Sequence, residues 1–386
     1  MKDFIYNLGK LSSAQLDDAL SQLDPAALGT MVESLNVGSV VNAMTQGRMS
    51  NLAAGGQVTN AGAAAFTSGS SQGRSSLAAS LSPGHGSDRP THTRASLSQD
   101  QSGYQAFFGK GKGGVWAQGF ALNHQQKTHK HIAGFGADSG GLLAGIDTPF
   151  LTPNLYIGAA VGYGRGDVHY KQGRGTGKIT SHLASVYTLY ATDAYYVDAS
   201  LALGMNTYRN NRRIAVIGKT AQSRHRGTEW APHLGAGVNF TLRHVDVQPF
   251  ANLEHMHLHE AGYTEKNADF ANLKVNSRSS SQWRGETGLN VSKTLLPFSK
   301  GTWTPLLKLS YIRKQPHKKG KMRSGFEGQS QTFETESLNL KQNQFSPGVG
   351  LKLNLNNGLY LTARYDAELS KISRVHEIGL KLGYAF

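Results

Sequence analysis

The stretch NLYIGAAVGYG, residues 154–164, alternates strictly between two kinds of side chain. Leu155, Ile157 and Val161 share one face, and the positions between them are mostly glycine or alanine. A period of two is typical of a β-strand, because successive side chains point to opposite sides of it. The stretch therefore predicts a strand with one apolar face and one small or polar face.

The same alternation recurs along the C-terminal two thirds of the chain, giving twelve predicted strands in all. The other eleven are 113–123, 139–149, 178–191, 195–206, 230–242, 245–258, 281–292, 303–313, 344–355, 358–367 and 375–386. Long polar segments follow the odd-numbered strands up to the ninth, at 124–137, 166–177, 208–226, 259–279 and 315–342. Mostly short turns follow the even-numbered strands. This alternation is typical of a transmembrane β-barrel, with short turns on one rim and long loops on the other.

The composition agrees with a barrel better than with a large soluble core. Of 386 residues, 46 are glycine and 38% are hydrophobic, below the roughly 45–50% of a soluble domain. No run approaches the ~18 apolar residues of a membrane-spanning helix. Cysteine is absent, which excludes disulfides and thiolate metal sites. The net charge of +15 follows no nucleic-acid-binding motif, so we expect no nucleic acid partner.

The polar face of the predicted strands is too charged for a packed core, and we place it in the lumen. Eight residues are predicted to line the pore: Asp198, Glu229, Asn239, Arg284, Glu286, Lys308, Arg364 and Asp366. The apolar face then meets lipid, and a closed barrel leaves no unpaired backbone groups there. All four tryptophans, Trp116, Trp230, Trp283 and Trp303, are near the start of predicted strands, where interfacial girdles are expected.

Two further zones precede the barrel, which we assign to 113–386. Residues 1–52 predict a helical linker region, since LSSAQLDDALSQL offers an N-cap serine before helically spaced leucines. Residues 53–112 are rich in Gly, Ser and Ala without a sustained period, as in a low-complexity linker. No signal-peptide pattern occurs in residues 1–30, so the chain is either cytoplasmic or a piece of an exported protein.

Several segments resemble the translocator (β) domain of type V autotransporters. VWAQGF, GGLLAGIDTP and LYIGAAVGYGRGDVHY resemble its first three strands, and WTPLLKLSYIRK with FSPGVGLKLNLNNGLYLTARYDAEL its later ones. The resemblance implies a barrel in the outer membrane of a Gram-negative bacterium, expected to be monomeric. It would allow export and surface anchoring of a covalently linked N-terminal passenger. The linker then runs through the pore, as residues 31–52 or as a segment within 88–112.

The last strand, VHEIGLKLGYAF, resembles the signal read by the outer-membrane assembly machinery. Its apolar positions are Ile378, Leu380, Leu382, Tyr384 and Phe386. An exposed strand of this kind can be recognised by strand addition. We therefore expect the assembly machinery as a partner.

The linker departs from the family in one respect. Some members cut themselves inside the barrel at an Asn-Asn pair shortly before an Arg-Met. Here Arg48 and Met49 are present, but Asn42 stands alone. We expect no cleavage by that route.

Other chemistry is sparse. His255, His257 and His259 share one strand face, but the third is too remote to ligate the same metal ion as the first, so we interpret them as an interfacial patch. No nucleophile with its base appears, and we expect neither an enzyme nor a cofactor. Basic residues of the loops, expected to face outer-membrane lipid and lipopolysaccharide, are Arg209, Arg212, Arg213, Lys219, Arg224, Arg226, Lys314, Lys318, Lys319, Lys321 and Arg323. Two alternatives stay open: a stand-alone channel or porin, and a surface adhesin with basic extracellular loops.

Overall fold

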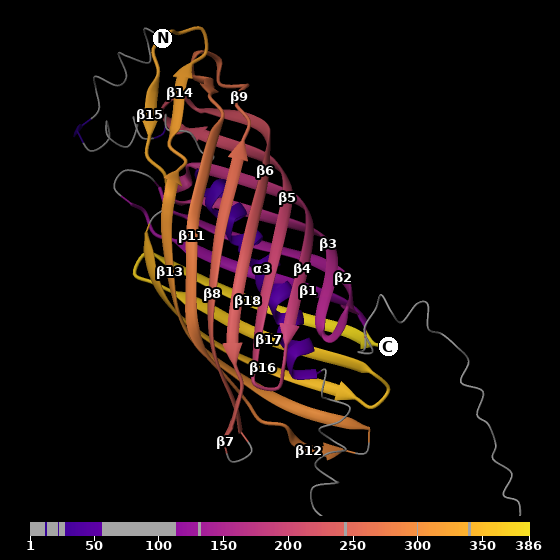
Figure 1. Cartoon of the computed structure of the whole chain (residues 1–386). Helices are drawn as coiled ribbons and strands as arrows, with labels where there is room; N and C mark the ends of the chain where they lie inside the picture. The colour runs from indigo at the N-terminus through magenta and orange to yellow at the C-terminus, as the bar shows by residue number, and fades with distance from the viewer. Residues whose placement is uncertain are drawn as a thin grey trace, which may run out of the picture.

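Twelve antiparallel strands form a closed ring around one helix in the computed structural model (Figure 1). The structure describes residues 12, 13, 22, 28–55, 113–129, 133–242, 245–298, 300–338 and 341–386. The ring strands are β1 (Gly114–Gln126), β2 (Phe135–Phe150), β3 (Thr152–Tyr170), β4 (Gly175–Ala191), β5 (Tyr195–Ile214), β6 (Lys219–Val238), β8 (Val245–Glu260), β11 (Arg278–Ser292), β13 (Gly301–Lys319), β16 (Gln342–Leu355), β17 (Leu359–Leu369) and β18 (Ser373–Ala385). Pairing of β1 with β18 closes the ring. The predicted all-β, twelve-stranded antiparallel barrel with an N-terminal helical segment is confirmed.

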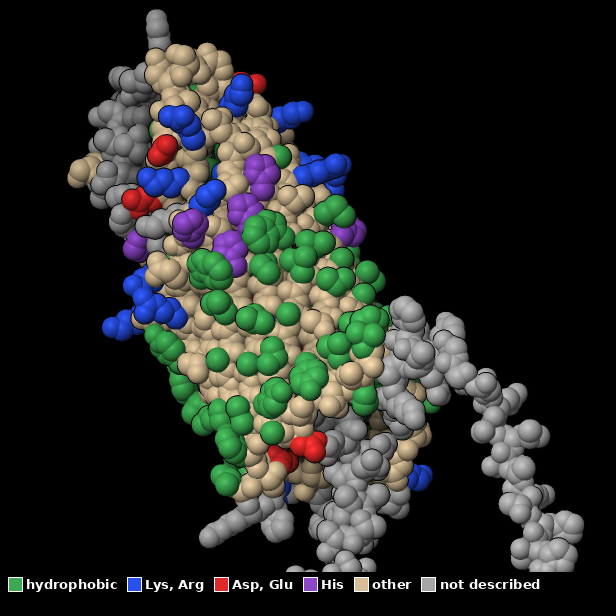
Figure 2. Space-filling model, viewed as in Figure 1, with side chains coloured by type: hydrophobic (Ala, Val, Ile, Leu, Met, Phe, Trp, Pro, Cys, Tyr) green, Lys and Arg blue, Asp and Glu red, His purple; other side chains and the backbone are tan. Residues whose placement is uncertain are grey.

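The two faces of the ring differ as the alternation predicts. Large apolar side chains cover the outside as a broad belt, seen in green in Figure 2, and Val161 is 67% exposed there. The inside carries glycine, polar and charged side chains together with buried apolar ones such as Leu183 and Tyr187. Because every strand has two hydrogen-bonded neighbours, the belt presents no open sheet edge to the surrounding hydrocarbon.

The prediction of a long loop is wrong for two segments. Residues 166–177 and 208–226 are largely strand, because β3 pairs with β4, and β5 with β6, almost to the tip of each hairpin. Only the short 3₁₀ turns η1 (Lys171–Gly173) and η2 (Ala215–Ile217) separate them. Beyond the membrane the outer face of a hairpin meets water instead of lipid, so the apolar alternation stops while the backbone ladder continues and the inner face stays buried. The end of the alternation therefore marks the end of the membrane rather than the end of the strand.

The long-loop rim carries a second, smaller sheet. It consists of β9 (Tyr263–Thr264), β10 (Leu273–Val275), β14 (Met322–Phe326) and β15 (Phe333–Thr335), in the order β15-β14-β10-β9. The turn η3 (Asp269–Ala271) lies between β9 and β10. Short strands β7 (Phe240–Leu242) and β12 (Leu295–Phe298) extend two hairpins at the opposite, short-turn rim (Figure 1).

Helix α3 (Leu28–Gly55) lies inside the ring, packed mainly against β3, β4, β5, β6 and β8 (Figure 1). Apolar and polar residues alike are buried around it, from Met31 and Val41 to Glu33 and Thr45. A helix suits this position because it satisfies its own backbone hydrogen bonds. Among the described residues, none of the helices combines the length and hydropathy that spanning a membrane would require.

The structure shows that one of the two candidate segments of the linker lies in the pore. Residues 31–52 lie within the helix that fills the lumen, whereas 88–112 lie outside the described residues, as does most of the predicted helix within 1–27. The helix continues to Gly55, three residues past the predicted boundary at 52. Residues 56–112 are outside the described part of the chain.

Candidate functional site

The lower half of α3 is fixed to the barrel wall by a buried ion pair. The Arg48 guanidinium donates through Nε and Nη2 to the two carboxylate oxygens of Asp147 on β2, both at 2.6 Å, and through Nη1 to the Tyr360 hydroxyl at 2.6 Å. The side chains of Arg48 and Asp147 are only 3% and 0% exposed. Tyr187 donates to the same carboxylate at 3.0 Å, and Trp116 donates to Tyr187 at 2.8 Å. Such charge-assisted, two-point contacts define both position and orientation.

The middle of the helix is joined to the opposite side of the lumen by Asn42. Its amide donates to the Glu254 carboxylate at 2.7 Å and to the Ala231 carbonyl at 3.1 Å, and its oxygen accepts from Ser200 at 3.3 Å. Ser39, one turn earlier, donates to Glu254 at 3.1 Å. The Asn42 side chain thus makes hydrogen bonds to three neighbouring strands of the wall, β5, β6 and β8.

Close packing supplements these bonds at Gly38. A Cβ at this position would lie 3.1 Å from Oε1 of Glu229, so the helix approaches the β6 wall more closely than a larger residue would allow. Glu229 is in turn held by Asn206, whose amide donates at 3.0 Å. The glycine therefore sets the distance between helix and wall.

The upper half of the helix contacts β1 and β2. Glu33 accepts a hydrogen bond from Ser139 at 2.6 Å and lies 2.8 Å from Nδ1 of His124. Asn36, on the next turn, lies 2.9 Å from the same imidazole nitrogen, and Ser34 lies 2.8 Å from the Tyr208 hydroxyl.

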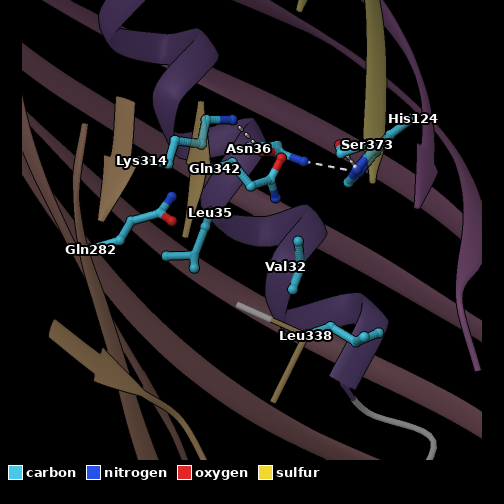
Figure 3. A pocket seen from close by; sticks show the side chains of 9 residues that line it. All are labelled: Val32, Leu35, Asn36, His124, Gln282, Lys314, Leu338, Gln342 and Ser373. Carbon is cyan, nitrogen blue, oxygen red and sulfur yellow. Dashed lines mark hydrogen bonds between the residues drawn. The ribbon is translucent and has the colours of Figure 1, made fainter. Parts of the chain in front are cut away.

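A small cavity remains beside this half of the helix. Figure 3 shows its lining, in which α3 faces side chains from β1, β11, β13, β16 and β18. The lining residues are Val32, Leu35, Asn36, His124, Gln282, Lys314, Leu338, Gln342 and Ser373. Its volume of about 10 Å³ is the space of roughly one water molecule. It is too small to be a ligand site.

The long-loop mouth of the barrel is closed by its own segments. Arg212 of β5 turns inward, donating through Nε to Glu265 at 3.0 Å and through Nη2 to the Ala271 carbonyl at 2.8 Å. The His225 ring stacks between Tyr208 and Tyr263, with centroids 4.7 and 4.4 Å apart. Burial, together with the nearby Glu265 carboxylate, raises the pKa of Tyr263 above its usual range. The hydroxyl of Tyr263 therefore stays neutral in this stack.

The wall of β11, β13 and β17 carries a connected ion network. Glu286 pairs with Arg284 and Lys308, each at 2.9 Å, and Glu368 pairs with Arg284 at 2.9 Å and Lys314 at 2.8 Å. Arg364 and Lys308 share Asp366 at 3.3 and 3.5 Å. The Arg364 side chain is 35% exposed although it faces inward, so solvent reaches this side of the lumen. The positive and negative side chains of this network neutralise one another on a part of the wall that α3 does not cover.

The predicted pore-lining residues do not all lie together. Arg284, Glu286, Lys308, Arg364 and Asp366 are in the ion network, with both suggested pairs, Arg284–Glu286 and Arg364–Asp366, formed. Asp198 bonds His233 at 2.9 Å on the helix-facing wall, where Glu229 also lies. Asn239 lies instead in the turn after β6, where its amide donates to the Asp193 carbonyl.

The girdle prediction is wrong for Trp116. This side chain is 3% exposed and faces the lumen, because in β1 the large residues point inward and the small ones outward. Trp230, Trp283 and Trp303 are 42%, 44% and 40% exposed on the outside. The prediction that loop residues Arg212 and Lys314 face outer-membrane lipid and lipopolysaccharide is also wrong, because both side chains are buried inside the barrel.

The five apolar residues of the predicted assembly signal all project outward from β18 and the chain end, with Ile378 and Phe386 the most exposed. Asp147, Glu254 and His124 were missed by sequence reasoning, although they hold the helix. For Asp147 and Glu254 the signal was a charged side chain on the inward face of a predicted strand, the same criterion that selected Asp198. His124 lies one residue beyond the predicted strand 113–123, in a segment predicted as loop, because β1 continues to Gln126.

A closed ring with an outer apolar belt and a charged lumen filled by its own helix defines a transmembrane β-barrel of the plugged type. Residues 115–366 match the family model of the autotransporter beta-domain. The chain belongs to this family, and it is an outer-membrane translocator domain, which is a transport domain. The translocator domain of autotransporter NalP from Neisseria meningitidis is similar, with a TM-score of 0.59 at 18% identity, over 71% of this chain and 88% of that one.

The beta domain of the Bordetella autotransporter BrkA is similar as well, with a TM-score of 0.57 at 21% identity, over 71% of this chain and 100% of that one. Among curated proteins, outer membrane protein B of Rickettsia conorii is 22% identical over 285 residues, and that of Rickettsia prowazekii is 21% identical. In both cases 71% of this chain is covered. The chain spans only 17% of the length of these relatives.

Proposed function

We propose that this barrel exports an N-terminal passenger, then retains the linker helix α3 as a plug that anchors the passenger at the surface and closes the pore. The observation that carries the proposal is the set of specific bonds between α3 and the wall, from Glu33 near one mouth to Arg48 near the other. A pore built for free diffusion has no use for a helix bonded along its length. The domain itself catalyses no reaction in this proposal.

The direction of the chain supports export. Arg48 lies at the short-turn rim, which in such barrels faces the periplasm. At the other end of the path, the Gln22 carbonyl accepts from Arg212, and its side chain accepts from the Val216 backbone in the long β5–β6 hairpin. Gln22, which precedes α3 in the chain, thus lies at the mouth that faces outward in this proposal.

The first experiment is single-channel conductance in planar bilayers, comparing residues 1–386 with 113–386. We expect the full chain to be nearly closed and the truncated barrel to form a stable open pore. Each preparation is first checked for the folded, heat-modifiable electrophoretic form. Equal, large conductance from both would instead support the porin.

Cysteine labelling tests the direction of the chain. Because the chain has no cysteine of its own, single substitutions report cleanly. Gln22→Cys should react with a membrane-impermeant maleimide on intact cells as Gln172→Cys in the β3–β4 hairpin does. Asn357→Cys, in the short β16–β17 turn, should stay unlabelled until the cells are lysed. Protection of Gln22→Cys in intact cells would contradict outward export.

We also propose that β18 is the strand recognised by the assembly machinery. Its outward apolar positions end at Phe386, whose backbone N–H donates to the Gly113 carbonyl at the seam with β1. Deletion of Phe386 should lower the heat-modifiable, folded fraction in the outer membrane several-fold, while Phe386→Tyr should retain most of it. Equal folded fractions in both variants and the unaltered chain would argue against this role.

A further inference from the structure

A cluster of histidines and tryptophans lies on the outside of the barrel, at the upper border of the apolar belt. We call it the histidine–tryptophan patch: Trp230, His255, His257, Trp283 and His317, from β6, β8, β11 and β13. In Figure 2 histidines gather between the green belt and the blue Lys and Arg side chains. Ring centroids of His255 lie 5.3 Å from Trp230 and 4.6 Å from Trp283, and His257 lies 5.4 Å from Trp230. The His257 ring thus stacks on Trp230, and the His255 ring packs at a tilt between Trp230 and Trp283.

The position of the patch fixes the depth at which it meets the membrane. Leu253, two residues before His255 on β8, is 48% exposed and pairs with Leu234 of β6, which is 55% exposed. These leucines belong to the belt that contacts acyl chains. One strand residue advances about 3.3 Å along a strand that is tilted by about 35–45° from the barrel axis, so His255 and His257 lie roughly 5 and 10 Å above the leucine level, where headgroups begin. A ligand here is a molecule with its apolar part in the membrane and its polar part at this height.

The charge around the patch is of one sign. His317 is close enough to His255, and Lys318 to His257, for their charges to interact. Arg226 is exposed on β6 just beyond this level. In the described parts of these four strands from this level upward, the acidic side chains are Glu229, Glu254 and Glu260, and all three are buried on the lumen side.

The chemistry of these groups suits a phosphate on a sugar. Imidazole, indole and ammonium groups supply N–H donors, and charge-assisted bonds to phosphate are among the strongest that side chains make. Among the described residues, no protein group bonds the ring nitrogens of His255 or His257, so both remain available. A divalent metal fits less well, because the described residues contain no group of three or more side chains arranged to hold one.

We propose that the histidine–tryptophan patch binds the phosphorylated sugar headgroup of an outer-leaflet glycolipid. The imidazoles of His255 and His257, with Lys318, contact the phosphate, while Trp230 and Trp283 pack against the sugar and the first acyl carbons. This site lies outside the lumen and does not depend on export of a passenger.

The test measures binding of lipid A to the full chain in a non-ionic detergent at pH 7 with EDTA, counted by native mass spectrometry. The bis-phosphorylated lipid is compared with the same lipid after removal of both phosphates. The patch variant is the double substitution His255→Gln/His257→Gln. The matched control is His169→Gln/His182→Gln, which removes two exposed histidines from β3 and β4 on another part of the outer face.

We expect the patch variant to bind the bis-phosphorylated lipid about tenfold more weakly than the unaltered chain, since it loses two imidazole hydrogen bonds to the phosphate, each worth roughly two- to tenfold in affinity. The control variant should bind like the unaltered chain, and the dephosphorylated lipid should bind all three equally and weakly. Equal binding by the patch variant, an equal loss in the control, or equal affinity for the dephosphorylated lipid would each overturn the proposal. Binding that is seen only when EDTA is left out would overturn it too, in favour of a bridging metal ion. Heat-modifiable mobility of each variant confirms that the barrel is folded.

Discussion

Replacement of Arg48 by methionine should release the lower end of the plug. Methionine keeps the unbranched apolar stem of the side chain but leaves the Asp147 carboxylate, which is 0% exposed, without its cationic partner. Removing one member of a buried ion pair costs about 3–5 kcal/mol, and each ~1.4 kcal/mol is a factor of ten in an equilibrium. When the helix end leaves the wall, Asp147 regains water, so most of this free energy favours the detached state. The detached population should therefore rise on the order of 10² to 10³-fold.

Planar-bilayer recording measures this population directly as the fraction of time the pore conducts. Arg48→Met should open far more often than the unaltered chain, and Asp147→Asn should open less often than Arg48→Met, because an amide still accepts a hydrogen bond from the guanidinium. The double variant Arg48→Met/Asp147→Leu should return toward the closed state, since no buried charge is left unpaired. Arg209→Met, an exposed arginine in the β5–β6 hairpin, is the matched control. Unchanged opening in both Arg48→Met and Asp147→Asn would refute the assignment of this ion pair as the anchor of the helix.

Three other outcomes are expected. Gly38→Val forces a side chain against Glu229 and should destabilise the plugged barrel by about 1–3 kcal/mol, measured as a lower temperature of the heat-modifiability transition. Gly285→Val is the control and should not lower this temperature, because an added Cβ there meets nothing within 4 Å. Equal shifts in both variants would mean that helix–wall packing is not the cause. In single-tryptophan chains, brominated acyl chains should quench Trp230, Trp283 and Trp303 but not Trp116, and strong quenching of Trp116 would contradict its place in the lumen. Residues 1–386 expressed alone should be recovered from membranes uncut, at 41.5 kDa, because Asn42 is not followed by a second asparagine and its side chain makes three hydrogen bonds to the barrel wall. Fragments separated after Asn42 would show that cleavage occurs.

The strands could be predicted from the sequence because a membrane imposes one simple rule on each of them. Side chains such as Ile157 and Val161 must face lipid, and a period of two records this directly. The rule ends at the headgroups, so the sequence predicts loop for the upper parts of β5 and β6, where the structure has strand. In β1 the rule is inverted, with Trp116 and Phe120 inside and small residues outside, because the lumen there needs bulk to fill space that the helix leaves.

The contacts inside the lumen were harder to predict, because the residues that form them are distant in sequence. Arg284 and Glu286 are neighbours on one strand face, so their pairing could be expected from spacing alone. Arg48 and Asp147 are separated by 99 positions, and nothing local to either residue indicates the other. Only the three-dimensional position of the helix brings them together. Charged residues within otherwise apolar strands identify one side of such a contact, but not what it binds.

The pairing of β1 with β18 has a consequence for the order of events in assembly. Thirteen residue pairs, from Gly114 with Ala385 to Gln126 with Ser373, join the first ring strand to the last. No part of this seam can form before the C-terminal strand is available, so the ring is completed late and by contacts between positions far apart in the chain. A 28-residue helix cannot pass sideways through a completed wall. Either α3 is enclosed while the sheet is still an open, curved surface, or it is drawn in lengthwise through a mouth after closure. A disulfide engineered across the seam would lock the wall and thereby distinguish these two histories.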